Sequence, residues 1–169
     1  MSDEWVEEIK RMKEETEKKI QKARTEEEAL RQKYKEDIKK ILDLIKAQCA
    51  PVVDTFKDPS KWEWQQPEFG VSETAKAAWI RVPLAFPTSL TLSFRLVLTD
   101  KGYSVEVRKQ FYDEVKNRTG SSTGHIHPSV KEDSIRSEIR NFLKDRNDAL
   151  ERLEQKRSKG LMPDMFRPI

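Results

Sequence analysis

The sequence predicts an α+β protein with a long N-terminal helix, a four-stranded antiparallel β-meander, and a C-terminal amphipathic helix packed on one face of the sheet. Three observations lead to this prediction. The first 49 residues lack glycine and proline and are rich in strong helix formers. Large apolar side chains occupy every second position from Leu90 to Leu98, which is typical of a strand with one buried face. Apolar residues then recur at helical spacing between Ile135 and Leu153.

The N-terminal helix is expected to begin after Ser2, a good N-cap that is followed by two acidic residues in the first turn. Pro51 is expected to stop or kink the helix, because proline lacks the N–H group that a helix interior uses. Thr25 and Glu28 resemble a capping box, which usually starts a helix. One continuous helix is favoured over two, because no glycine or proline precedes Thr25.

One face of this helix carries an apolar stripe that extends from Trp5 to Cys49. Its mean step is about 3.67 residues, which is an eleven-residue repeat and gives a nearly straight or slightly right-handed helix pair. Thr16 and Glu27 interrupt the stripe. We therefore predict that residues 1–29 form a projecting coiled-coil arm that pairs the chain as a homodimer, and that residues 30–169 form a compact domain. The predicted interface contains Trp5, Ile9, Met12, Ile20 and Ala23.

The first strand of the sheet is expected to contain Trp62 and Trp64, which lie two residues apart and so share a face, and to end by Gly70. Both tryptophans are expected to pack in the core or on a helix rather than to stack on bases. The second strand is expected over residues 77–84. Its pairing should weaken at Pro83, because proline cannot donate a hydrogen bond to the neighbouring strand.

The third and fourth strands are expected to form a hairpin around a turn at residues 99–102. The register should pair Leu98 with Tyr103, because a shift by one residue would mix the apolar and polar faces. The same register places Arg95 opposite Glu106 on the outer face, where opposite charges attract.

The outer face of the sheet presents a possible binding surface formed by Trp79, Arg81, Arg95 and Arg108. One interpretation is a surface for a ligand, a protein or a nucleic acid. The other is an ordinary solvated face, which the sequence favours.

Residues 117–129 form a cluster of glycine and serine that also holds His125 and His127. The sequence favours a flexible connection here. The two histidines are weak candidates for a metal site, because no third ligand is evident nearby and such sites normally have three or four. Binding of an anion at the start of the following helix is the other alternative.

The second helix is predicted to open with a capping box at Ser129 and Glu132 and to continue to about Ser158, with Gly160 as its stop. Residues 159–169 form an apolar tail. This tail is expected either to dock on its own domain or to anchor another chain.

Composition limits the classes of function. The chain is 36% hydrophobic and 37% charged, with a net charge of +3 that is not gathered in a basic block, so nucleic-acid binding is not favoured. Cys49 is the only cysteine and lies on the apolar stripe, which predicts an inert core thiol. With no signal peptide and no apolar run long enough for a membrane span, a cytoplasmic protein without membrane contacts is expected.

No sequence motif for a catalytic nucleophile, a dinucleotide or a metal helix is present, so no cofactor is predicted. The predicted function is that of a non-enzymatic structural or interaction protein that self-associates through its first helix and could also contact another protein. The alternatives are a nucleic-acid-binding module that uses the arginines of the sheet, or an enzyme that depends on a metal or anion at His125 and His127.

Overall fold

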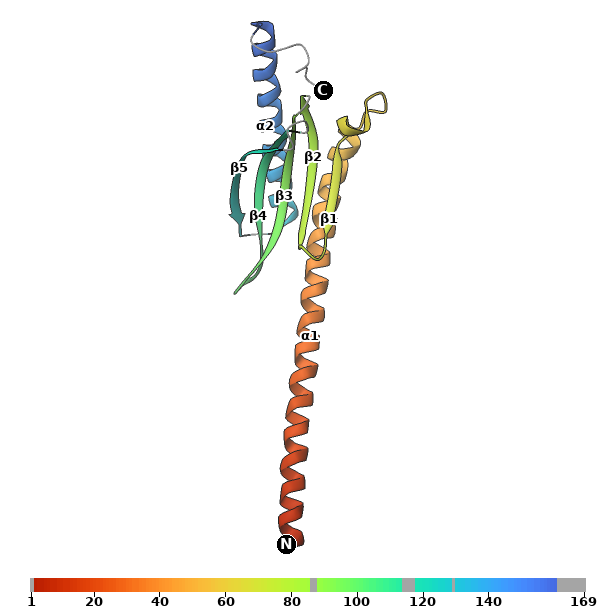
Figure 1. Cartoon of the computed structure of the whole chain (residues 1–169), viewed down its shortest axis with the longest axis vertical. Helices are drawn as coiled ribbons and strands as arrows, with labels where there is room; N and C mark the ends of the chain where they lie inside the picture. The colour runs from red at the N-terminus through yellow and green to blue at the C-terminus, as the bar shows by residue number, and fades with distance from the viewer. Residues whose placement is uncertain (1, 86–87, 114–117, 129, 161–169) are drawn as a thin grey trace. The chain divides into compact units, whose positions relative to one another are not determined.

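The computed structural model describes residues 2–85, 88–113, 118–128 and 130–160. The chain divides into two compact units, Met1–Lys39 and Lys40–Ile169. The predicted α+β class is confirmed: a long helix α1 (Asp3–Phe56) precedes an antiparallel sheet, and helix α2 (Glu132–Ser158) contacts that sheet (Figure 1). The sheet has five strands, however, and not four.

Helix α1 is continuous, as predicted. The amide of Trp5 contacts both oxygens of Ser2, at 3.1 Å for the carbonyl and 3.4 Å for the hydroxyl, so Ser2 caps the helix. Thr25 caps nothing, because its hydroxyl donates to the carbonyl of Gln21 at 2.9 Å, one turn earlier. Pro51 was expected to stop or kink the helix, and it does not stop it, since the helix continues to Phe56. Proline removes one backbone hydrogen bond, and the buried face of the helix continues past it.

The strands follow one another in the sheet in chain order, and all neighbouring pairs are antiparallel. They are β1 (Glu68–Ser72), β2 (Ala77–Ala85), β3 (Thr88–Thr99), β4 (Gly102–Asp113) and β5 (Arg118–His127). The predicted hairpin register is confirmed, with Leu98 opposite Tyr103 and Arg95 opposite Glu106. The β2–β3 pairing is irregular after Pro83, as the missing amide hydrogen predicts.

The predicted first strand around Trp62 and Trp64 is wrong. Residues Glu63–Gln65 form a short 3₁₀ helix, η1, and Trp62 is 74% exposed rather than in the core. Glutamine side chains satisfy the backbone here: Gln65 accepts from the amide of Trp62 at 3.2 Å, and Gln66 donates to the carbonyl of Lys61 at 3.0 Å. These local bonds replace the ladder that a strand would have used.

The expected flexible connection at residues 117–129 is also wrong, because most of it forms strand β5 along the free edge of β4. Its glycines and serines have weak strand preference, so the pattern gave no strand signal. Pairing with β4 supplies the backbone hydrogen bonds instead. Residues 117 and 129 lie outside the described part of the chain.

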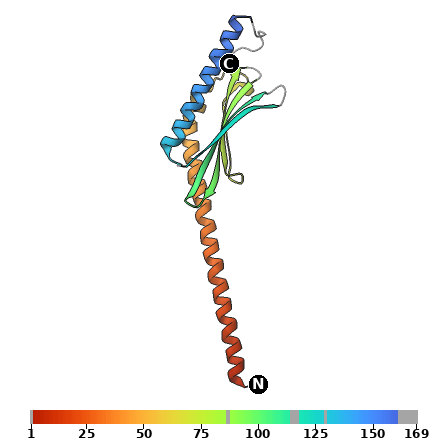
Figure 2. The same cartoon turned by 90° about the vertical axis from the view of Figure 1, so that its left-hand side faces the viewer.

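The hydrophobic core lies between one face of the sheet and two helical segments, residues 40–56 of α1 and helix α2, which cover the same face (Figure 2). Strands β2, β3 and β4 supply alternating buried residues, and α1 supplies Leu42, Ile45, Cys49 and Val52. The guanidinium of Arg136 on α2 donates to the side-chain oxygen of Gln48 at 2.6 Å and so joins the two helical segments. The compact domain was predicted to begin at residue 30. Leu30 belongs to the unit formed by residues 1–39 and is 49% exposed there.

Helix α2 begins at Glu132 with Lys131 as N-cap, and the side chain of Lys131 makes no capping bond. The expected capping residue, Ser129, lies outside the described residues. The helix ends at Ser158, and Gly160 follows it with a φ of +70°, a left-handed conformation that suits glycine. The apolar tail lies outside the described residues from residue 161 onward.

Candidate functional site

The predicted interface residues of α1 are all solvent-exposed within the unit formed by residues 1–39. The large apolar side chains of this stripe are Trp5 (51% exposed), Ile9 (46%), Met12 (60%), Ile20 (47%) and Leu30 (49%), and Ala23 is exposed as well. Single exposed apolar residues are ordinary on protein surfaces. A periodic row of them on one helix face is different, because an isolated helix of this kind normally gains its stability by covering that face.

Glu27 is the charged residue in the middle of this stripe. Its Oε1 lies 2.6 Å from Nη2 of Arg31, one turn later on the same helix. This pair is exposed, so it adds little to stability by itself. It does bring a positive charge next to the carboxylate, so the stripe carries a neutralised pair at this position rather than a lone negative charge.

The outer face of the sheet carries the four predicted surface residues together, because Trp79, Arg81, Arg95 and Arg108 all alternate outward from their strands. All three arginines form ion pairs with carboxylates of the same sheet. Arg81 lies 3.1 Å from Glu68 of β1, whereas Arg95 and Arg108 both reach Glu106, at 2.9 Å and 2.7 Å.

Glu106 is the centre of this arrangement. The hydrogen bond from Arg108, together with the charge of Arg95, holds the pKa of Glu106 below its usual value. The carboxylate therefore stays ionised and offsets part of the positive charge of the face. Three arginines balanced by two glutamates do not form the concentrated basic patch that phosphate backbones attract.

Trp79 packs against the neighbouring strand β1. Its indole ring lies over Gly70 of β1, so closely that a Cβ built on Gly70 would come within 2.0 Å of the ring. The tryptophan thus covers a strand position that has no side chain, which is a packing role.

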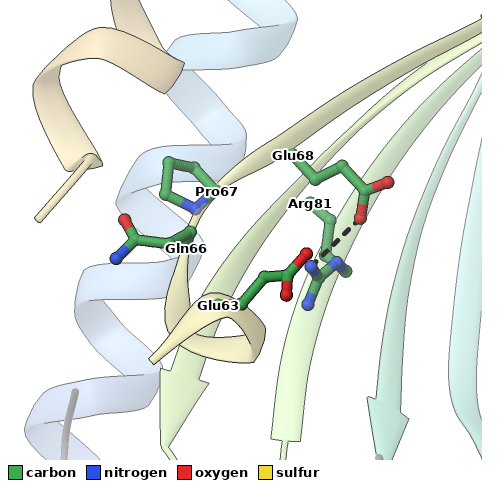
Figure 3. A pocket seen from close by; sticks show the side chains of 5 residues that line it. All are labelled: Glu63, Gln66, Pro67, Glu68 and Arg81. Carbon is green, nitrogen blue, oxygen red and sulfur yellow. Dashed lines mark hydrogen bonds and ion pairs between the residues drawn. The ribbon is translucent and has the colours of Figure 1, made fainter. Parts of the chain in front are cut away.

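A pocket of about 560 Å³ opens at one end of this face, between η1 and the start of β1 (Figure 3). Glu63, Gln66, Pro67, Glu68 and Arg81 line it. Figure 3 shows the guanidinium of Arg81 joined to Glu68, so the one cationic group among these residues already has a carboxylate partner. Among the described lining residues there is no histidine, cysteine or serine, and Glu68, one of the two glutamates, is paired with Arg81.

The two histidines of β5 lie on the inner face, towards α2. Nε2 of His125 is 2.7 Å from Oε1 of Glu138, and Nε2 of His127 is 4.0 Å from the same oxygen. Nδ1 of His127 is buried and has no hydrogen-bond partner among the described residues. Glu138 itself is only 7% exposed.

In this cluster the His125 ring is hydrogen-bonded directly to the Glu138 carboxylate. Within the described residues, no three His, Cys, Asp or Glu side chains are grouped so as to hold a metal ion. The contact instead ties the edge strand β5 to α2.

Two buried polar residues of α2 were missed in the sequence, namely Glu138 and Arg146. Arg146 is 7% exposed, donates from Nε to the carbonyl of Pro83 at 3.0 Å, and lies 4.6 Å from the ring centre of Phe56. Burial lowers the pKa of this guanidinium, which still remains charged. Both residues lie at the helical spacing of the buried apolar positions of α2, and that placement was the available signal.

Cys49 is fully buried, and burial raises the pKa of its thiol to about 12. A protonated thiol is a poor nucleophile, so Cys49 offers no reactive group to a catalytic site.

Comparison of this chain with family models, with curated proteins and with solved structures finds no match. None of the helices in the described part of the chain combines the length and the apolar character needed to cross a bilayer.

Proposed function

We propose that this protein is a non-enzymatic interaction protein that self-associates through the N-terminal part of α1. The observation that carries this proposal is the exposed apolar stripe, which includes Trp5, Ile9, Met12, Ile20 and Leu30. Covering such a stripe removes apolar surface from water at about 25 cal/mol per Å². A second copy of the helix brings the same stripe and can cover it reciprocally.

The remaining candidate surfaces support this choice by their contacts. On the outer face of the sheet, the arginines are paired with Glu68 and Glu106. On the inner face, the histidine closest to Glu138 is hydrogen-bonded to it. These groups fulfil structural roles within the domain, whereas the stripe of α1 is built to face another chain.

Light scattering coupled to size exclusion tests the proposal directly. At tens of micromolar protein, we expect a mass of twice the 19.9 kDa of one chain. A single peak with the mass of one chain would overturn the proposal. Fluorescence anisotropy with DNA and RNA at low salt tests the alternative of nucleic-acid binding, for which we expect no change on addition of the protein.

A further inference from the structure

A pocket of about 270 Å³ lies near the C-terminal end of α1, where the segment after this helix comes close to β2 and α2. Its described lining holds three cationic side chains, those of Lys57, Lys61 and Arg146, and one carboxylate, that of Asp58. All of these residues belong to the unit Lys40–Ile169, so the pocket is independent of the N-terminal part of α1 and of the self-association proposed above. The lining therefore carries an excess of positive charge.

Arg146 forms part of the wall of this pocket. Its Nε donates to the carbonyl of Pro83 at 3.0 Å, and its guanidinium carbon lies 4.6 Å from the ring centre of Phe56. Pro83 and Phe56 also line the pocket. These two contacts hold the guanidinium in place, so a ligand would meet a cationic group whose orientation is already set.

Most of the hydrogen-bond donors of Arg146 have no partner. A guanidinium carries five N–H groups, and Pro83 accepts from one of them. Within the described part of the chain, neither terminal nitrogen donates a hydrogen bond, and no carboxylate forms an ion pair with Arg146. The one fully enclosed side-chain polar atom without a partner among the described residues is Nδ1 of His127, so both terminal nitrogens of Arg146 keep some access to solvent. Buried charges are normally paired, and Arg146 is only 7% exposed, so an anion in the pocket would complete this site.

Lys57 and Lys61 add two further positive charges. Lys57 is exposed and Lys61 is half-buried, and neither ammonium group forms an ion pair with a described residue. The carboxylate of Asp58 accepts two hydrogen bonds from Ser60, at 2.6 Å from the hydroxyl and 3.0 Å from the amide. These bonds, with a smaller contribution from the charge of Lys61, lower the pKa of Asp58. Asp58 therefore stays ionised and offsets one of the three cations, which leaves a formal charge of +2 on the described lining.

We propose that this pocket binds a phosphate group, either free or as the monoester of a small molecule. The planar guanidinium of Arg146 can donate from its two terminal nitrogens to two oxygens of such a group. A phosphate monoester carries a charge of about −1.5 to −2 at pH 7, which balances the lining, whereas a carboxylate carries a single charge. The volume of about 270 Å³ is just below the roughly 300–1,000 Å³ of typical ligand pockets, which favours a small phosphate compound.

Isothermal titration calorimetry of the full-length chain tests the site. The probes are inorganic phosphate and glycerol 3-phosphate, with acetate as a singly charged anion, and chloride keeps the ionic strength constant. We expect saturable binding of at least one phosphate probe, with acetate bound at least about tenfold more weakly. The phosphate probe that binds more tightly identifies the source of the group as free or organic phosphate. If neither phosphate probe binds at millimolar concentration, or if acetate binds equally well, the proposal is overturned.

A pair of double variants assigns the binding to this pocket. Lys57→Gln with Lys61→Gln removes two cations of the lining and should weaken phosphate binding about tenfold or more, because two charge-assisted contacts are lost. The matched control, Lys46→Gln with Lys101→Gln, removes the same charge from exposed positions of the same unit outside the described lining. We expect the control to bind like the unmodified chain. Equal affinities of the two double variants would contradict the proposal, because the effect would then come from net charge alone.

Arg146→Gln removes the central cation and should abolish measurable phosphate binding. Its urea unfolding midpoint shows whether the domain still folds. A folded Arg146→Gln variant that binds phosphate like the unmodified chain would overturn the proposal. If this variant does not fold, the lysine variants decide the outcome, since Lys57 is exposed, Lys61 is half-buried and neither forms an ion pair with a described residue.

Discussion

Replacing Ile9 and Ile20 together by serine should abolish most of the self-association. Each isoleucine is about half exposed, at 46% and 47%, so pairing removes on the order of 80 Å² of each from water, worth about 2 kcal/mol at about 25 cal/mol per Å². Two substitutions in each of two chains affect four side chains. Association recovers only part of the transfer energy, so we expect a loss of at least about 3 kcal/mol, which is a Kd about a hundredfold weaker or more.

Sedimentation equilibrium over a range of protein concentrations measures this change. The matched control replaces Lys10 and Gln21 by serine, each one residue after a substituted isoleucine and so turned about 100° away from it around the helix. Serine and isoleucine have similar helix propensities, whereas lysine and glutamine are better helix formers, so the control loses at least as much intrinsic helicity. Equal weakening in both double variants would refute the argument, because the effect would then come from the helix and not from its apolar face.

Two further outcomes are expected. Gly70→Ala should destabilise the domain by about 1–2 kcal/mol in urea unfolding, because Trp79 occupies the space of the new methyl group, and an unchanged midpoint would contradict this. Glu106→Gln should flatten the acid limb of the stability curve. Because the pKa of Glu106 is lowered in the folded protein, its carboxylate stabilises the fold at pH values above its ordinary pKa, and this contribution is lost as the pH falls. If the stability curves of the variant and of the unmodified protein run parallel between about pH 5 and pH 3, this reasoning is contradicted.

The elements with a strong local period could be predicted from the sequence. Alternation in β3 and β4 predicted the register that pairs Leu98 with Tyr103, because a slip of one residue would reverse the faces of both strands. The continuous helix through Thr25 followed in the same way from the absence of glycine and proline. Such patterns are readable because they depend on residues that are near neighbours in the chain.

The errors occurred where a distant segment or a side-chain bond replaced the local pattern. Strand β5 has the composition of a loop and becomes a strand because the edge of β4 offers it hydrogen bonds. Trp62 was expected in the core, and glutamine side chains instead hold its segment in a turn that leaves the ring in solvent. In both places the backbone partner decided the structure.

The same distinction between local pattern and distant contact applies to the candidate sites. The sequence by itself determined the apolar stripe of α1, because helical spacing fixes which side chains share a face. Only the tertiary structure decided that Arg95 and Arg108 share Glu106, that His125 binds Glu138, and that Arg146 is buried. The physical reason is that a periodic pattern reports whether a residue faces inward or outward, whereas a polar side chain takes its role from the group that meets it, and that group comes from elsewhere in the chain.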